Sequence, residues 1–254
     1  MNPPMNQTPL LVDTGWLEAH LHDPALRIFD CSVRRWIDDA GVYRVARGDE
    51  DYREGHIPNA QLLDLVEDLS APGSPLRFTL PTPERFARAV EALGVSDDSH
   101  VVLYGTGDVQ YTTRAWWMFR VFGFDRASVL DGGWQAWSAE GRPVTTDVPR
   151  ISPGRFTPGY RPTLVAHRAD VLAAMEDPGA CLINALAPDI HAGTTHVHYG
   201  PAGATSRPGR IPGSVNLWAL DLVDKATNRF LPLAQLQAKF AALGVAGAGS
   251  VITY

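Results

Sequence analysis

The sequence predicts an α/β protein built from two similar domains, each a parallel sheet flanked by helices. The first observation is an internal repeat: the segment Gly55–Ala60 returns about 150 residues later as Gly209–Ser214. The second is that short apolar runs alternate with helical stretches in both copies. The third is that these runs are continuous, which is typical of parallel strands covered on both faces. Together they predict a parallel α/β fold that occurs twice.

The first copy opens with Leu11-Val12, followed by a helical stretch and the apolar run Leu26–Asp30, which we predict as a buried strand. A helix is predicted next, over Pro83–Leu93. Four apolar residues recur at helical spacing on one of its faces: Phe86, Ala89, Val90 and Leu93. Gly94 follows, where the end of a helix favours glycine.

The first copy continues with a strand at Val101–Tyr104, a loop, an aromatic helix at Thr113–Phe122 and a strand at Ser128–Leu130. The motif Asp131–Trp134 follows that strand directly. We assign residues 1–148 to the first domain.

The second copy begins after a proline-rich segment, residues 149–162, which we predict to be an extended, semi-rigid linker. This copy opens with Leu164-Val165 and continues with the apolar run Cys181–Asn184. It reaches Val251–Tyr254 after a further helix. We assign residues 163–254 to the second domain.

The second copy stops at the counterpart of the strand Val101–Tyr104. By comparison with the first copy it lacks roughly 45 residues, the counterpart of the stretch from Gly105 to the linker. Such a half-domain would leave a sheet edge and apolar surface uncovered. We therefore expect the second domain to be incomplete in this chain.

The composition is that of a globular protein, with 254 residues, 45% of them hydrophobic and 20% charged, and a formal net charge of −6. The arginines are scattered, so we expect no nucleic-acid partner. No apolar run approaches the roughly 18 residues that a membrane helix needs, and the first residues show no secretory signal, so we expect no membrane partner. Two cysteines exclude a disulfide scaffold, and a cytoplasmic location is the simplest expectation.

In the order of its motifs the chain resembles the tandem-domain rhodanese family of thiosulfate and 3-mercaptopyruvate sulfurtransferases. The motifs that carry the resemblance are Gly55–Pro58, Asp131–Trp134 with Trp137, Gly193-Thr194 and Gly209–Asn216. The resemblance implies two rhodanese-like domains, the first of them usually inactive. It also implies that the second carries the catalytic cysteine directly after the strand that ends at Tyr254. We therefore expect the nucleophile immediately after Tyr254, and no catalytic residue or activity in this chain alone.

The chemistry that the resemblance implies needs a cysteine in a tight strand–loop–helix turn. Backbone N–H groups and a helix N-terminus there lower the pKa of the cysteine, so that it is a thiolate at neutral pH. The thiolate takes sulfur from a small anionic donor, becomes a persulfide, and passes the sulfur to cyanide or a thiol. No metal or organic cofactor is required. In the first copy Gly105 occupies the aligned position, so we expect that domain to be non-catalytic.

Three arginines are candidates for binding the anionic donor, because guanidinium groups bind oxyanions well: Arg207, Arg210 and Arg77. The family often carries a substrate-binding arginine where this chain has Ile190. Relatives specific for mercaptopyruvate tend to have histidine at Phe78, so the phenylalanine favours a donor of the thiosulfate type. The pair His196 and His198 lacks a third ligand motif, and we expect no metal site.

Two other interpretations stay open. The chain could be a non-catalytic rhodanese-like module that binds a partner or an anion; only a cysteine after Tyr254 would favour the enzyme over it. It could also be a phosphatase with the same loop architecture, although that activity needs a longer loop with Cys and Arg, and the tandem arrangement argues against it. We expect Cys31 and Cys181, both at strand ends, to be small buried side chains.

Overall fold

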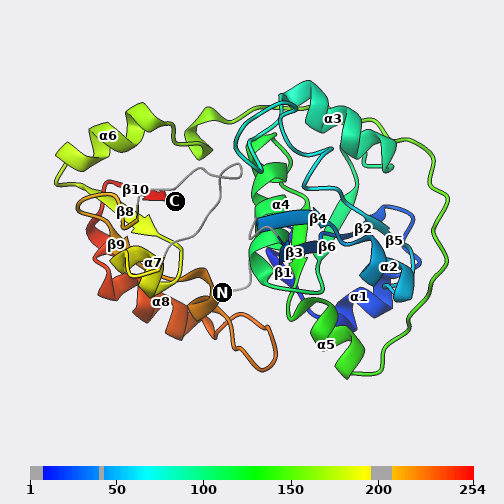
Figure 1. The fold of residues 1–254 in the computed structure, drawn as a ribbon. Coiled ribbons are helices and arrows are strands. Elements are labelled where there is room, and N and C mark those ends of the chain that lie inside the picture. Colours follow the sequence, from blue (N-terminus) through cyan, green and yellow to red (C-terminus); the bar gives the residue numbers. More distant parts are fainter. Residues whose placement is uncertain (1–7, 40–42, 196–207) are drawn as a thin grey trace. The chain divides into compact units, whose positions relative to one another are not determined.

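The computed structural model describes residues 8–39, 43–195 and 208–254, and the chain forms two compact units (Figure 1). Unit 1 contains Met1–Arg161 and Thr227–Arg229, and unit 2 contains Pro162–Ala226 and Phe230–Tyr254. Apart from residues 227–229, unit 1 thus holds the first copy of the repeat and unit 2 holds the second.

Unit 1 is built on a five-stranded parallel sheet with the strand order β1-β7-β6-β2-β5. In that order the strands are Leu11–Val12, Ala127–Leu130, His100–Tyr104, Leu26–Asp30 and Ala60–Leu62. The central strand β6 pairs with β2 on one side and with β7 on the other, and its last four residues are buried. This arrangement confirms the predicted α/β fold with a parallel sheet, in which continuous apolar runs form the inner strands.

The helices of unit 1 are α1 (Thr14–His20), α2 (Asp49–Glu54), α3 (Pro83–Ala92), α4 (Val109–Val121) and α5 (Gly133–Ala139). The α3 helix begins where the sequence predicts, because Thr82 caps it with its side chain and Pro83 occupies the first turn. Its buried face includes Ala87 in place of the predicted Ala89. The α4 helix starts about one turn before its predicted start, because its first turn is too polar to show an apolar period.

An antiparallel hairpin, β3 (Val33–Ile37) and β4 (Tyr43–Arg47), is absent from the sequence-based prediction. Most of its side chains are exposed or half-buried, and it does not join the parallel sheet. It therefore lacks the apolar run by which the buried strands are recognised.

The proline-rich segment forms no helix or strand over residues 149–161, and it belongs to unit 1 up to Arg161. Phe156 is buried, and its ring centroid lies 5.7 Å from those of both Phe86 and Phe124. The Gly154 N–H also donates to the carbonyl oxygen of Glu91 at 2.8 Å. The compact unit therefore extends beyond residue 148, because this segment covers apolar surface of α3 and of the turn after α4.

Unit 2 has a three-stranded parallel sheet in the order β10-β8-β9. Its strands are Ser250–Thr253, Ala180–Asn184 and Val215–Asn216, its α-helices are α6 (Arg168–Glu176), α7 (Pro188–Ala192) and α8 (Leu233–Ala242), and its 3₁₀ turns are Pro162–Leu164, Ala219–Leu222 and Val245–Gly247. The parallel pairing of β10 with β8 repeats that of β6 with β2.

Residues Leu164 and Val165 differ from their counterparts at the start of the first copy. Leu11–Val12 form β1 by pairing with β7, whereas Leu164 ends a 3₁₀ turn. The described part of unit 2 contains no counterpart of β7, so the pairing that makes β1 a strand does not arise there.

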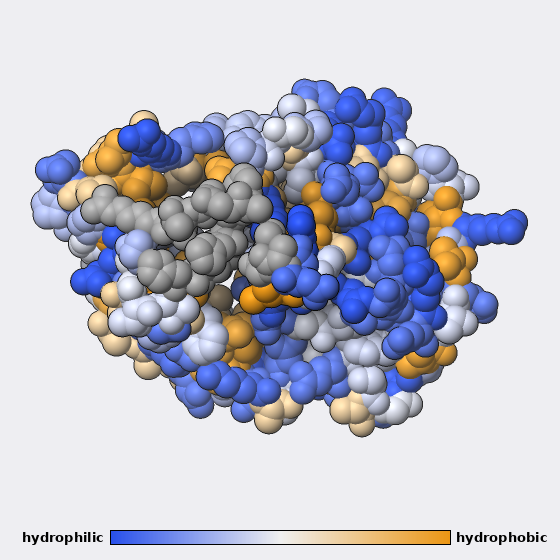
Figure 2. All heavy atoms as spheres, in the orientation of Figure 1, coloured by the Kyte–Doolittle hydropathy of each residue, from blue (hydrophilic) through white to orange (hydrophobic). Residues whose placement is uncertain are grey.

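Unit 2 covers its apolar side chains less completely than unit 1. None of α6, α7 and α8 has a fully buried residue, and Leu172 and Met175 of α6 are exposed. On the face shown in Figure 2, hydrophobic residues form separate patches among hydrophilic ones. Within the described residues, no helix has the length and apolar character needed to cross a membrane.

We expect Phe156→Ala to lower the free energy of unfolding by about 3 kcal/mol, because the lost ring leaves a cavity beside Phe86 and Phe124. Urea unfolding followed by tryptophan fluorescence measures the change. Val148→Ala is the matched control, since Val148 is 67% exposed, and should cost less than about 0.5 kcal/mol. Equally small effects of both substitutions would contradict the packing of this segment on unit 1.

Candidate functional site

The carboxyl ends of β6 in unit 1 and of β10 in unit 2 have the same construction. In unit 1 the hydroxyl of Tyr104 accepts a hydrogen bond from the N–H of Ile57 at 3.3 Å. In unit 2 the hydroxyl of Tyr254 accepts one from the N–H of Ile211 at 2.9 Å. Each isoleucine precedes the proline of its Ile-Pro segment. A tyrosine therefore ties the end of the strand to the Ile-Pro turn in both copies.

Backbone hydrogen bonds around this strand end are repeated as well. The carbonyl oxygen of Tyr104 accepts from the N–H of Cys31 at 2.7 Å, and that of Tyr254 accepts from the N–H of Ala185 at 2.9 Å. Because side-chain and backbone partners agree, Tyr254 is the structural counterpart of Tyr104. The position after Tyr254 then corresponds to Gly105.

In unit 1 this position opens the loop Gly105–Asp108, which joins β6 to α4. Gly105 is buried, and its carbonyl oxygen accepts from the N–H of Trp134 at 3.1 Å. A Cβ atom at Gly105 would lie 3.0 Å from the hydroxyl oxygen of Thr112. The loop thus contains no thiol and leaves little room for a side chain at its first position.

A chain of hydroxyl groups runs beneath the loop to a buried carboxylate. The backbone N–H of Thr106 donates to the Oγ of Ser32 at 2.9 Å, and the Thr106 hydroxyl donates to the same atom at 3.0 Å. Ser32 in turn donates to Oδ1 of Asp30 from its hydroxyl and, at 2.9 Å, from its N–H. One of the loop N–H groups is therefore already occupied and is not directed at a bound sulfur or anion.

Asp30 lies at the carboxyl end of β2 and is almost completely buried. Burial raises its pKa, and the hydrogen bonds from Ser32 act in the opposite direction. Its Oδ2 atom has no hydrogen-bond partner within the described parts of the chain. No sequence pattern groups Asp30, Ser32 and Thr106, because Ser32 and Thr106 are 74 residues apart.

The surroundings of the unit 1 loop are acidic. A cavity of about 480 Å³ beside it is lined by Asp51, Glu54, Gly55, Thr106, Trp134 and Val144. Asp108 stands at the N-cap of α4, where its carboxylate pairs with Arg35 at 2.6 Å. A carboxylate at a helix N-terminus occupies the place that an anionic ligand would favour. This loop is therefore poorly suited to a negatively charged donor.

The two cysteines lie in different environments. Cys31 is fully buried, as predicted, and burial together with the nearby Asp30 raises its pKa well above the ordinary thiol range. Cys181 is partly exposed, so its predicted burial is wrong, and it lies near the amino end of β8, opposite the strand ends that carry the loops. A buried thiol with a raised pKa is a poor nucleophile, because the thiolate is the reactive form.

The predicted donor-binding arginines are not all within the described residues. Arg210 is exposed in unit 2, and its Nη1 lies 3.5 Å from the carbonyl oxygen of His191. Arg77 belongs to unit 1, where it donates to the carbonyl oxygen of Tyr43. Arg207 lies outside the described residues, as do His196 and His198. Among the residues that are described, no group of three or more His, Cys, Asp or Glu side chains could hold a metal ion.

Comparison with known proteins identifies relatives along most of the chain. The family model for the rhodanese-like domain matches residues 13–140. The chain is 33% identical to the sulfur carrier protein TtuD of Thermus thermophilus, over 96% of this chain and 81% of that protein. It is 36% identical to the thiosulfate sulfurtransferase of Bos taurus, over 82% of this chain and 68% of that protein.

The fold also matches a solved structure of similar size. The crystal structure of SseA from Escherichia coli, a 3-mercaptopyruvate sulfotransferase, aligns with a TM-score of 0.80 and 29% sequence identity. The match covers 97% of this chain and 88% of that one.

We expect Asp30→Asn to raise the free energy of unfolding at pH 7 by roughly 1 kcal/mol, because it removes a buried charge while keeping an acceptor for Ser32. Since the folded pKa is raised, native stability falls as pH rises from the ordinary carboxyl range through that pKa. The increase in the free energy of unfolding caused by Asp30→Asn should therefore shrink below about pH 4, where the Asp30 carboxyl is protonated in both the folded and the unfolded state. Chemical unfolding across pH measures it, with exposed Asp98→Asn as control. Destabilisation by Asp30→Asn at pH 7 would contradict this account.

A thiol introduced by Gly105→Cys should not acquire the reactivity of a catalytic cysteine. The Thr106 N–H is donated to Ser32, and Asp108 places negative charge at the helix N-terminus. We expect a thiol pKa at or above about 8.5, falling by roughly half a unit when Asp108→Asn is added. The pH dependence of iodoacetamide alkylation measures both values. A thiol pKa below neutrality in the single variant would show that the loop N–H groups still stabilise an anion.

Proposed function

Because this chain belongs to the rhodanese family, whose matched relatives include sulfurtransferases, we propose that it moves sulfane sulfur from thiosulfate, or a related donor such as 3-mercaptopyruvate, to cyanide or a thiol. The observation that carries this proposal is the correspondence of Tyr254 with Tyr104. We infer from it that the residue after Tyr254 begins a loop at the carboxyl end of β10. That is the position at which backbone N–H groups can stabilise a thiolate.

The proposed nucleophile is a cysteine directly after Tyr254. Its thiolate attacks the outer sulfur of the donor, a new S–S bond forms, and the bond from that sulfur to the rest of the donor breaks. With thiosulfate, the leaving group departs as sulfite with the bonding electron pair. The acceptor then attacks the outer sulfur of the persulfide, and the cysteine leaves as the thiolate again. No oxidant or reductant is consumed, in keeping with two-step covalent catalysis.

Arg210 is proposed to bind the anionic donor in unit 2. It stands directly before Ile211, whose N–H donates to the Tyr254 hydroxyl, so its backbone lies close to the proposed loop. The exposed guanidinium contacts only the carbonyl oxygen of His191 among its described neighbours, at the long distance of 3.5 Å. This leaves N–H groups available for an oxyanion. Arg207 and Arg77 remain proposed contributors.

Unit 1 is proposed to be non-catalytic. Gly105 provides no nucleophile, the Thr106 N–H is already donated, and acidic side chains line the neighbouring cavity. These features also support a second candidate function for unit 1, that of a binding or regulatory module. Such a module would not bind the anionic donor at this loop, because the charge there has the wrong sign.

We expect residues 1–254 alone to form no thiocyanate from thiosulfate and cyanide, because neither described cysteine has the required environment. In the natural protein, changing the residue after Tyr254 to serine should lower turnover by at least about a thousandfold. The Cys31→Ser and Cys181→Ser variants are the matched controls and should keep turnover within about twofold. The standard colorimetric assay for thiocyanate measures residues 1–254, the unmodified natural protein and the three variants.

Turnover by residues 1–254 that disappears in Cys31→Ser or Cys181→Ser would contradict the proposal, since the nucleophile would then lie within the two units. A residue other than cysteine after Tyr254, together with no turnover, would favour the binding module.

A further inference from the structure

Unit 2 contains counterparts of the two residues that contact the loop after β6 in unit 1. In unit 1, Asp30 is the last residue of β2, and its Oδ1 accepts from the N–H of Ser32 at 2.9 Å. In unit 2, Asn184 is the last residue of β8, and its Oδ1 accepts from the N–H of Leu186 at 3.0 Å. In both units the residue between them donates its N–H to the carbonyl oxygen of the strand-end tyrosine. Asn184 therefore stands where unit 1 has Asp30, and Leu186 stands where it has Ser32.

In unit 1 the Ser32 hydroxyl lies beside the first positions of the loop. A Cβ atom at Gly105 would lie 3.8 Å from its Oγ. The N–H of Thr106 donates to the same Oγ at 2.9 Å, and the Ser32 hydroxyl donates onward to Asp30. A side chain at position 105 would therefore be close to a hydroxyl that already accepts a loop N–H, and that hydroxyl is hydrogen-bonded to a buried carboxylate.

Both of these properties are changed in unit 2. Leu186 has no polar side-chain atom, so it cannot accept from an N–H placed like that of Thr106. Asn184 is almost completely buried, as Asp30 is, but its amide is neutral. Its Oδ1 also accepts from Nδ2 of Asn216 at 3.4 Å, and the same Nδ2 donates to the carbonyl oxygen of Leu186 at 2.8 Å. The turn after β8 is therefore held by neutral groups, with no hydroxyl at the position of Ser32.

This difference affects an anion at the first position of the following loop. A backbone N–H can stabilise a thiolate only where it is not already donated to a protein acceptor. A buried carboxylate nearby disfavours a second negative charge. In unit 1, burial and, after it, the Asp30 carboxylate raise the pKa of the neighbouring Cys31 thiol. The corresponding residues of unit 2 provide neither a hydroxyl acceptor nor a carboxylate.

We propose that Asn184 and Leu186 are positioning residues for the sulfur-transfer nucleophile, because they leave the N–H groups of the loop after Tyr254 free to stabilise its thiolate and then its persulfide. The proposal rests on the proposed function, since it takes that nucleophile to be the residue after Tyr254. It adds that the reactivity of the nucleophile depends on the end of β8 as well as on its own loop.

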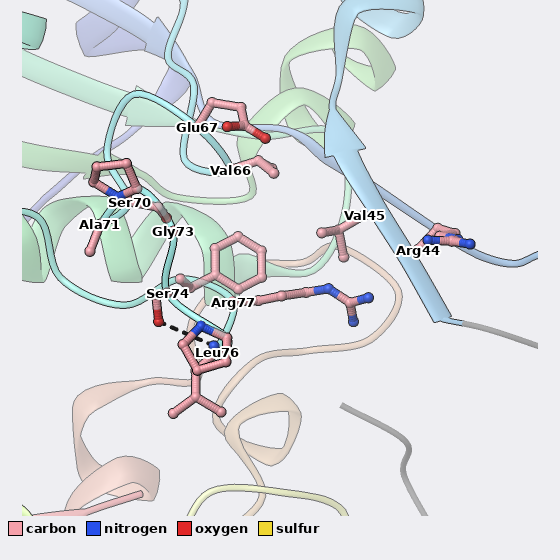
Figure 3. A pocket seen from close by; sticks show the side chains of 13 residues that line it. Arg44, Val45, Val66, Glu67, Ser70, Ala71, Gly73, Ser74, Leu76 and Arg77 are labelled. Carbon is pink, nitrogen blue, oxygen red and sulfur yellow. Dashed lines mark hydrogen bonds between the residues drawn. The ribbon is translucent and has the colours of Figure 1, made fainter. Parts of the chain in front are cut away.

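The first test transfers the unit 2 arrangement to unit 1 of the 254-residue chain, where it is independent of the proposed nucleophile. In Gly105→Cys, adding Ser32→Ala frees the Thr106 N–H, and we expect the thiol pKa to fall by about one unit. Adding Asp30→Asn as well should lower it by about one further unit, because a buried charge is removed. The matched control is Ser70→Ala, a buried serine at a separate cavity of unit 1 (Figure 3), which should leave the pKa unchanged. The pH dependence of iodoacetamide alkylation, followed by mass spectrometry on the peptide with residue 105, measures each value.

The second test makes the reverse changes in the natural protein. Leu186→Ser supplies a hydroxyl where unit 1 has Ser32, and Asn184→Asp supplies a buried carboxyl. We expect each to raise the thiol pKa of the residue after Tyr254 by about one unit, and to move the acid limb of the pH profile for thiocyanate formation upward by the same amount. Leu233→Ser, at an exposed position of α8, is the matched control and should change neither.

The outcomes separate this proposal from the proposed function. If the unmodified natural protein has no reactive thiol after Tyr254, the proposed function fails and this proposal with it. If that thiol is present but its pKa is unchanged by both unit 2 substitutions, only this proposal is overturned. A Gly105→Cys thiol whose pKa falls with neither Ser32→Ala nor Asp30→Asn would overturn it as well. Circular dichroism establishes that each variant is folded, and the natural-protein variants decide the question if Gly105→Cys does not fold.

Discussion

The hydrogen bond from an isoleucine N–H to a tyrosine hydroxyl fixes the end of β6 in unit 1 and of β10 in unit 2. Tyr104 is fully buried, so its hydroxyl and the Ile57 N–H would both lose hydrogen bonding to water if they did not pair. The same bond joins Ile211 to Tyr254. In each unit it connects the strand to the Ile-Pro turn, which is distant in sequence, and so sets where the following loop begins. The position of the Gly105 loop in unit 1 and the proposed nucleophile position in unit 2 depend on this link.

The two units share this link, and in unit 1 the loop that follows it is described in full. Unit 1 has a five-stranded sheet. In its Gly105–Asp108 loop, the Thr106 hydroxyl donates a hydrogen bond to the Oγ of Ser32, whose hydroxyl donates to Asp30. Loop N–H groups that satisfy a protein acceptor cannot also stabilise a thiolate. The carboxylate of Asp108 adds to this at the start of α4. The electrostatics of this loop disfavour an anion.

The repeat and the buried strands could be predicted from the sequence because they depend on local patterns, namely apolar runs and, at Gly94, a glycine after a helix. The β3–β4 hairpin could not, because its exposed strands carry no apolar run. The packing of Phe156 on Phe86 could not be predicted either, because the sequence of a proline-rich segment does not show whether the segment packs against a domain. At the site, the equivalence of Gly105 and the position after Tyr254 follows from the repeat. The Thr106–Ser32–Asp30 chain does not, because it arises from contacts between segments distant in sequence.

We propose that sulfur is carried by the residue after Tyr254 and by neither Cys31 nor Cys181. Peptide mapping by mass spectrometry, after the natural protein is incubated with thiosulfate and its free thiols are blocked, tests it most directly. The account predicts one added sulfur atom on the peptide that continues past Tyr254, removed by cyanide, and none on the peptides that contain Cys31 or Cys181. Added sulfur on Cys31 or Cys181 that cyanide removes, with none past Tyr254, would contradict it.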